Sequence, residues 1–295
     1  MTPQTALMTT AAPLAQIDPN ADDDLLIAMW LRSKESPRTR EEYGRDVERF
    51  RRFVAKPLRA VGLNDLQSYA DDLRTGYATG SQQRMLASVK SLITFGHRLG
   101  YFPFDAGKAL KLPKQKDTLA QRLLSEEEVI AMIALEPSPR NKLLIRSLYV
   151  SAGRISEVTG ISWQDLKARE EGGQVTLYGK GGKTRAVLIP AKLWCDLMNA
   201  RSDEADDAPL FRSRVGKRLS KTQAWRIVRA AALRAGIKGN VSPHWMRHAH
   251  ASHSLERGAS LALVGSTLGH ANVSTTSKYV HARPSDSSSR VLAIG

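Results

Sequence analysis

The sequence has very little cysteine and no long apolar run. Cys195 is the only cysteine among 295 residues, which excludes an internal disulfide and favours a reducing compartment. We expect Cys195 to be a core residue of a helix. No apolar stretch approaches the roughly 18 residues of a membrane-spanning helix, and Met1–Asn20 lacks the basic start and apolar block of a signal peptide. These absences predict a cytoplasmic, nucleoid-associated protein with no membrane partner.

Acidic residues are scarce relative to basic ones. The chain carries 44 Lys and Arg against 29 Asp and Glu, a net charge of +15 and a pI near 10.1. The excess is larger in the second part: 18 basic and 14 acidic residues precede position 118, and 26 and 15 follow. Such a balance predicts a polyanionic partner, usually a nucleic acid. Charge alone leaves ribosomal, chromatin-like and regulatory proteins open.

Helical periodicity begins at Leu25 and predicts a small all-helical bundle. Ser36-Pro37 is a helix start, and Tyr43 to Val54 then carries apolar residues at helical spacing. A second helix surrounds Leu66 to Leu73, and we expect Ser81 to cap a third. The predicted organisation is a flexible leader, an N-terminal helical domain, a basic linker, and a catalytic domain with a C-terminal tail, at 1–24, 25–112, 113–122 and 123–295.

The second domain is predicted to be mainly helical with one small β-hairpin. Ser125 and Glu128 form the pattern of a capping box that starts its first helix. Residues 174–178 and 185–189 are rich in β-formers and flank a glycine-rich turn. Further helices are expected at 191–200, 221–235, 243–257, 260–268 and 273–281.

Two local motifs suggest sites that their surroundings do not support. Gly182-Lys183-Thr184 resembles the end of a phosphate-binding P-loop, but Leu177 stands where the first glycine belongs, and a strand rather than a helix follows. His244 and His248 have a spacing that zinc could use. No Cys, Asp or Glu lies nearby before Glu256, and we expect His97, His250, His253 and His281 to be surface or core residues. Neither a metal nor a cofactor is predicted.

A wider pattern combines an early arginine with a C-terminal array. Arg154 follows a glycine break in Ser-Ala-Gly-Arg-Ile-Ser-Glu, and His244 and Arg247 lie three residues apart on one helical face. His270 follows Leu-Gly at a helix end, and Tyr279 comes nine residues later. Each motif alone is weak, but their order in a basic chain is specific.

With these motifs, nearly the whole chain from Leu25 resembles the tyrosine recombinase, or phage integrase, family, especially its compact Xer-like bacterial members. The resemblance includes the Arg-Ile-Ser-Glu block, the Gly-Lys-Gly-Gly-Lys-Thr-Arg hairpin, and His-x-x-Arg-His through Leu-Gly-His to the tyrosine. One departure is that relatives commonly have Thr-Gly-Leu where this chain has Ser151-Ala152-Gly153. The residues that match the catalytic positions of the family are Arg154, Lys180, His244, Arg247, His270 and Tyr279.

The resemblance implies site-specific DNA recombination without metal or ATP. The tyrosine would attack a phosphodiester and form a 3′-phosphotyrosine, and the two arginines would bind the phosphate oxygens. The hairpin lysine would protonate the leaving 5′ oxygen. His244 would exchange a proton with the tyrosine, and His270 would hydrogen-bond the phosphate. Strands would be exchanged through a Holliday junction in a tetramer.

The implied partners are double-stranded DNA with specific sites, further copies of the chain, and an accessory DNA-bending or directionality factor. Both domains would clamp the duplex, and the apolar C-terminal end at 291–294 would dock on a neighbouring protomer. Candidate phosphate contacts lie on the N-terminal helices, on the linker, and around a basic helix that would enter the major groove: Arg40, Lys90, Lys111, Lys114, Lys116, Lys217, Lys221, Arg226 and Arg229.

Two other functions would use part of the same pattern. A type IB topoisomerase shares the tyrosine, arginine and lysine chemistry, although the N-terminal helices and the Leu-Gly-His spacing favour a recombinase. A DNA-binding regulator without catalysis would explain the charge, but it would not need all six matching side chains.

Overall fold

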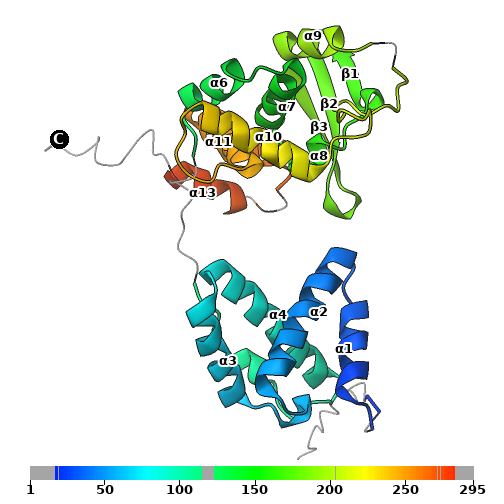
Figure 1. The fold of residues 1–295 in the computed structure, drawn as a ribbon, viewed down its shortest axis with the longest axis vertical. Helices are drawn as coiled ribbons and strands as arrows, with labels where there is room; N and C mark the ends of the chain where they lie inside the picture. Colours follow the sequence, from blue (N-terminus) through cyan, green and yellow to red (C-terminus); the bar gives the residue numbers. More distant parts are fainter. Residues whose placement is uncertain are drawn as a thin grey trace, which may run out of the picture. The chain divides into compact units, whose positions relative to one another are not determined.

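The computed structural model describes residues 17–18, 20–114, 123–202, 204–270, 272 and 274–282, most of them helical (Figure 1). The chain divides into two compact units, Met1–Lys116 and Asp117–Gly295. Most of the predicted leader and linker, and the whole C-terminal end at 291–294, lie outside the described residues, so these assignments stay predictions. Among the described helices, none is long and apolar enough to cross a membrane.

The first unit is a helical bundle around aromatic side chains. Trp30 stacks on Tyr43 with ring centroids 5.4 Å apart, and Phe50 meets Tyr69 edge-on at 5.0 Å. Trp30, Phe50 and Tyr69 are fully buried. The helices of this unit are α1 (Asp23–Arg32), α2 (Pro37–Val54), η1 (Leu58–Ala60), α3 (Leu63–Gly76), α4 (Thr79–Arg98) and α5 (Ala106–Ala109).

Of the two helix caps predicted in this unit, the structure contains one. Ser36 accepts a hydrogen bond from the backbone N–H of Thr39, and Pro37 occupies the first helical position, as predicted for α2. The prediction that Ser81 caps α4 is wrong. The helix begins at Thr79, and the Ser81 backbone N–H already donates to the Ala78 carbonyl oxygen within the first turn.

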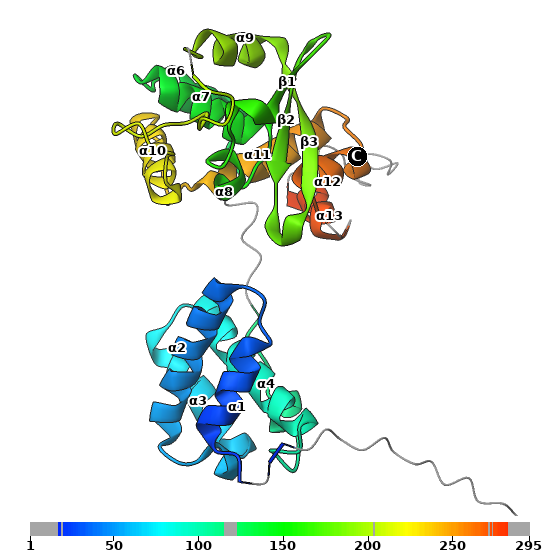
Figure 2. The same cartoon turned by 90° about the vertical axis from the view of Figure 1, so that its right-hand side faces the viewer.

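The second unit combines a three-stranded antiparallel sheet with helices (Figure 2). The strand order is β1-β2-β3. Gly173 in β2 leaves room for Trp194 of the helix that follows β3, because a Cβ there would lie 1.9 Å from the indole ring. The elements are α6 (Glu126–Ala134), α7 (Pro139–Val150), α8 (Ile155–Val158), η3 (Trp163–Asp165), β1 (Leu166–Arg169), β2 (Gly172–Tyr178), η4 (Lys180–Gly182), β3 (Thr184–Pro190), α9 (Ala191–Asn199), α10 (Lys221–Arg234), α11 (Pro243–Glu256), α12 (Leu261–Leu268) and α13 (Ser274–Ala282).

The structure confirms the predicted fold class and hairpin, and it adds one strand. β2 and β3 pair antiparallel with Thr176 opposite Ala186, and β3 follows the glycine-rich turn directly, which rules out the helix that a P-loop requires. Ser125 and Glu128 form the predicted reciprocal capping box. Strand β1 has only four residues, none of them buried, and the sequence analysis did not predict it.

Cys195 lies in a helix, but the prediction that it is buried is wrong. On α9 the fully covered residues are Leu193 and Leu197, and Cys195 is exposed. Two residues along a helix turn the side chain by about 200°, so a residue midway between two core positions faces solvent.

A small apolar cluster lies apart from the main core of this unit. It joins Ala152, which follows α7, with Ala251 of α11, Leu268 of α12 and Tyr279 of α13. Four segments that are distant in the sequence therefore meet at one place, and this place positions the candidate site.

Candidate active site

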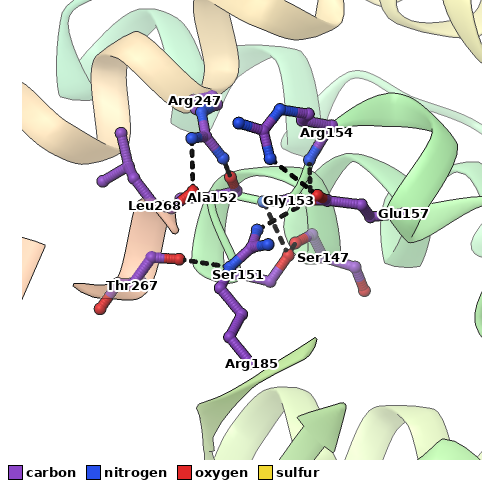
Figure 3. Close-up of polar contacts among 10 residues, drawn as sticks. All are labelled: Ser147, Ser151, Ala152, Gly153, Arg154, Glu157, Arg185, Arg247, Thr267 and Leu268. Carbon is purple, nitrogen blue, oxygen red and sulfur yellow. Dashed lines mark hydrogen bonds and ion pairs between the residues drawn. The ribbon is translucent and has the colours of Figure 1, made fainter. Parts of the chain in front are cut away.

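Arg247 is a buried arginine at the centre of the site. Its side chain donates to the carbonyl oxygens of Ala152 at 2.6 Å and of Leu268 at 2.5 Å (Figure 3). Burial lowers the pKa of Arg247 to about 10, and the positive charges of Arg154 and Arg185 contribute to this shift. The guanidinium is therefore still charged at neutral pH, and both hydrogen bonds in Figure 3 go to neutral carbonyl groups.

The break after α7 presents both the Ala152 carbonyl group and Arg154. Ala152 adopts a left-handed backbone conformation with φ of 47°. Gly153 has no room for a side chain, because a Cβ would lie 2.5 Å from Cγ2 of Val158. Both residues are buried. With this φ, Ala152 holds a backbone conformation in which L-residues are strained.

Glu157 holds two arginines at the start of α8. Its Oε1 accepts from the Arg154 side chain at 2.8 Å, and its Oε2 accepts from the Arg154 backbone N–H at 2.7 Å. Arg185 of β3 donates to the same Oε2 at 2.8 Å. Burial by itself raises the pKa of Glu157, but the hydrogen bonds from Arg185 and Arg154 outweigh it and hold the pKa below its ordinary value. Glu157 is therefore a buried carboxylate that orients both arginines.

Arg185 also ties the hairpin to the end of α12. Its Nε donates to the Thr267 carbonyl oxygen at 2.7 Å, as Figure 3 shows. α12 ends at Leu268 and is capped by Gly269, whose φ is +67°, and the Arg185 side chain lies 3.1–3.4 Å from the place of a Cβ on that glycine. His270 follows immediately. The glycine thus serves both the left-handed helix end and the close approach of Arg185.

His270 is half-buried and linked to the last described helix. Its Nδ1 lies 2.8 Å from Oγ1 of Thr276, which is fully buried on α13. Burial lowers the pKa of His270 to about 4, and the positive charges of Arg247, Arg154 and Arg185 add to this effect. The ring is therefore neutral at neutral pH, so it can act as a hydrogen-bond donor to an anion without carrying a charge.

Tyr279 is buried among the apolar residues of the small cluster. Its side chain is 5% exposed, and its hydroxyl oxygen lies 2.8 Å from Nδ1 of His248. Burial raises the pKa of Tyr279, and the positive charge of Arg247 opposes that rise in part. A tyrosine in this position needs a neighbouring base or an approaching cation before it can act as a nucleophile.

His244 is exposed at the start of α11. Its ring lies edge-on to the ring of His248, with centroids 4.2 Å apart. A pocket of about 420 Å³ lies between His244, Arg154 and Trp225 of α10. Two of the predicted catalytic residues, Arg154 and His244, thus line one pocket.

The structure brings together five of the six predicted catalytic residues, Arg154, His244, Arg247, His270 and Tyr279, on neighbouring elements of the second unit. For the sixth, Lys180, only the backbone is described. It begins η4 at the tip of the β2–β3 hairpin.

Sequence reasoning missed His248, Glu157 and Arg185 as site residues. His248 lies four residues after His244, and that helical spacing could have identified it as a second histidine on the same face. Glu157 and Arg185 belong to matched motifs. Their pairing depends on the fold, which brings α8 and β3 together.

Two of the histidines expected to be surface or core residues make structural contacts. His253 is buried, with Nδ1 2.9 Å from the Tyr149 hydroxyl and Nε2 2.9 Å from the Leu124 carbonyl oxygen. His97 contacts the Phe102 carbonyl oxygen, and the side chain of His281 lies outside the described residues. Within the described part of the chain, no group of three or more His, Cys, Asp or Glu side chains could hold a metal ion.

The candidate DNA contacts differ in how far they are exposed. Lys90 is half-buried, and its ammonium group donates to the Leu110 carbonyl oxygen at 3.1 Å. Lys116 lies outside the described residues. The remaining candidates are exposed side chains, namely Arg40, Lys111, Lys114, Lys217, Lys221, Arg226 and Arg229.

Comparison with known proteins gives consistent matches for both units. Residues 122–286 match the Phage integrase family, and residues 23–99 match the Phage integrase N-terminal SAM-like domain. The tyrosine recombinase XerC of Pelobacter propionicus is 32% identical over 263 residues, which cover 83% of this chain and 85% of the relative.

Solved structures show a similar fold. A lambda integrase dimer bound to a COC′ core site has a TM-score of 0.75 at 15% identity, covering 90% of this chain and 95% of that one. A lambda integrase tetramer bound to a Holliday junction has a TM-score of 0.70 at 14% identity, covering 85% and 78%. At these identities the likeness establishes the fold alone.

Proposed function

The chain belongs to the phage integrase family, and from that premise we propose that Tyr279 cleaves one DNA strand and forms a 3′-phosphotyrosine. The family places the chain among the tyrosine-type site-specific recombinases, in agreement with the predicted activity and in preference to a topoisomerase or a non-catalytic regulator. The proposal also covers the roles of individual residues, the covalent intermediate and the oligomeric assembly.

The observation that carries the proposal is an excess of positive charge beside the tyrosine. The positive charges of Arg154 and Arg185 act on the buried Arg247, and Glu157 is a buried carboxylate that pairs with Arg154 and Arg185. Arg247 donates to carbonyl oxygens instead. Burying charge without a counter-ion is unfavourable, so the site is suited to an anion. A DNA phosphate would supply that charge.

The two predicted arginines suit a phosphate that becomes more negative during attack. Their forked donors stay charged and can bind two oxygens at once. Stabilising charge in the transition state is usually the largest catalytic contribution. Arg154 is 44% exposed and borders the pocket, so it can reach a phosphate there. Arg247 would act from the buried side.

His270 is suited to hold a phosphate oxygen. The Thr276 hydroxyl can donate to Nδ1, and Nε2 then carries the ring proton and can donate to the oxygen. Lys180, at the tip of the hairpin, would give a proton to the leaving 5′ oxygen. His244 lines the same pocket as Arg154 and would contact the substrate there.

A phosphotyrosine bond keeps the energy of the phosphodiester that it replaces, so the strand can be rejoined without ATP. Recombination would then proceed in a tetramer through a Holliday junction. The similar lambda integrase structure contains such a tetramer bound to a Holliday junction. The exposed basic residues of both units, together with Lys116, would contact the DNA backbone. Double-stranded DNA with specific sites is the proposed partner, aided by an accessory DNA-bending or directionality factor.

The test is covalent capture of DNA by the full chain. Fragmented genomic DNA from the source organism is incubated with the protein and quenched with detergent, and the DNA bound to the protein is sequenced. We expect one class of site to be enriched on the wild type and no adduct on Tyr279→Phe, with equal DNA binding by both. No adduct on the wild type, or an adduct on Tyr279→Phe, would contradict the proposal.

A further inference from the structure

His248 contacts the hydroxyl group of Tyr279, and none of the roles above includes it. Its Nδ1 lies 2.8 Å from the Tyr279 hydroxyl oxygen, and the ring centroids are 5.5 Å apart. The two residues belong to α11 and α13 and are 31 positions apart in the chain. The contact is therefore a product of the fold, and it fixes the direction of the tyrosine hydroxyl group.

The two histidines on this face of α11 occupy different surroundings. His244 is exposed and lines the pocket together with Arg154. His248 is half-buried one helical turn later, where α11 packs against α13. Their rings are in edge-on contact at 4.2 Å. His248 is thus the histidine at the tyrosine hydroxyl, and His244 is the one beside the pocket.

Tyr279 needs help to lose its proton. An ordinary tyrosine has a pKa near 10, and burial raises the pKa of Tyr279 above that value. Arg247 lowers it only in part. A base at hydrogen-bond distance from the hydroxyl would remove the proton as the bond to phosphorus forms, and His248 is at that distance.

We propose that His248 orients the Tyr279 hydroxyl group and accepts its proton during DNA cleavage, a role that rests on the proposed phosphotyrosine chemistry. The hydroxyl oxygen bonds to phosphorus while its proton moves to Nδ1 of His248. The bond from phosphorus to the 5′ oxygen breaks, and that oxygen takes a proton from Lys180. On rejoining, the 5′ hydroxyl oxygen attacks phosphorus and its proton returns to Lys180, while His248 returns its proton to the departing tyrosine oxygen.

The first test needs no DNA and uses the full chain labelled with nitrogen-15 at histidine. The signals of His248 are identified by their loss in His248→Asn. We expect Nδ1 to be unprotonated, the proton to be on Nε2, and Tyr279→Phe to shift the His248 signals while leaving those of His253 unchanged. A proton on Nδ1, or unchanged His248 signals in Tyr279→Phe, overturns the proposed hydrogen bond.

The second test compares adduct formation on a nicked duplex that carries the site recovered by covalent capture. His248→Ala removes the ring, and His248→Asn keeps a polar atom near the position of Nδ1 that cannot take up a proton. We expect both to slow adduct formation by about 10²- to 10⁴-fold with unchanged DNA binding. Added imidazole restores part of the rate in His248→Ala, whose site is open, but not in His248→Asn.

His250→Asn is the matched control on the same helix, since its ring contacts Tyr149 and lies outside the site. It should form the adduct at the wild-type rate. A wild-type rate in His248→Ala overturns the proposal, and a wild-type rate in His248→Asn overturns proton transfer. If the wild type itself forms no adduct while the nitrogen-15 signals are as expected, the proposed function fails and the hydrogen bond stands.

Discussion

Arg247 donates a hydrogen bond of 2.6 Å to the carbonyl oxygen of Ala152, a residue 95 positions earlier in the chain. The bond joins α11 to the turn that presents Arg154, so it links the two segments that carry the predicted catalytic arginines. Ala152 turns its carbonyl group toward Arg247 from a left-handed conformation. The arginine that we expect to bind phosphate therefore also shapes the site in the free protein.

Arg247→Lys should destabilise the fold as well as the reaction. A lysine ammonium lacks the fork that reaches both the Ala152 and Leu268 carbonyl oxygens. A buried carbonyl left without a partner costs about 1–3 kcal/mol, and we expect a loss of that size in urea unfolding. Arg226→Lys, at an exposed position of α10, should change the free energy of unfolding by less than about 0.5 kcal/mol. Equal effects of the two substitutions would contradict the structural role of Arg247.

Gly153→Ala should disturb the turn before Arg154. The added Cβ would lie 2.5 Å from Val158 and 3.0 Å from the Ser151 hydroxyl oxygen, and such overpacking costs about 1–3 kcal/mol. Gly44→Ala in α2 is the control, because its Cβ would meet only Leu31 at an ordinary 3.7 Å. It should stabilise the helix by about 0.5–1 kcal/mol. Thermal and urea unfolding compare the two, and a neutral Gly153→Ala would count against the tight turn.

Arg185→Gln should slow DNA cleavage although Arg185 is not among the predicted catalytic residues. It links Glu157 to the Thr267 carbonyl group, and so holds Arg154 and His270 in their places. A shift of about 1 Å in catalytic groups can reduce a rate by roughly 10²-fold, and we expect a loss of that order in adduct formation. In a double-mutant cycle of unfolding free energies, Arg185→Gln and Glu157→Gln should be coupled by about 0.5–3 kcal/mol. Simple additivity would show that the ion pair has no energetic role.

Acidification should destabilise the protein through His250. Burial lowers the pKa of His250 to about 4 in the folded chain, against an ordinary value of 6.5. The unfolded state therefore binds the proton first, and the contribution of His250 to stability is full above pH 6.5 and is lost as the pH falls toward about 4. Each unit of pKa difference corresponds to about 1.4 kcal/mol.

Urea unfolding across this pH range measures the effect. His250→Asn should flatten the pH dependence but not abolish it, because His270 has a pKa lowered to about 4 and acts in the same direction. An unchanged slope in His250→Asn would show that His250 is protonated equally in both states.

Local sequence signals predicted those features of the fold that depend on neighbouring residues, such as helix starts and the hairpin. Ser36-Pro37 and the Ser125–Glu128 capping box start their helices as expected, because a cap involves only neighbouring residues. The hairpin follows from two runs of β-formers around glycines. Ser81 shows the limit of such signals, since a helix can begin two residues before a good cap when packing favours it.

The sequence predicted several residues of the site, but it did not predict the contacts between them. The motifs indicated His244 beside the tyrosine, whereas the packing of α11 against α13 places His248 there. The second bond of Arg185, to Thr267, joins residues 82 positions apart, and no local pattern encodes it. The ammonium group of Lys90 bonds a carbonyl oxygen of its own unit, which its charge alone does not reveal, and its contact with DNA stays a prediction. Tertiary packing decides each of these outcomes.

The most direct test of the account is the identity of the residue that becomes attached to DNA. The trapped wild-type adduct is digested with nuclease and protease, and the peptides are analysed by mass spectrometry. We predict one modified peptide, with a nucleotide joined through its 3′ phosphate to the Tyr279 oxygen. A nucleotide on any other side chain, or a linkage through a 5′ phosphate, would contradict the account.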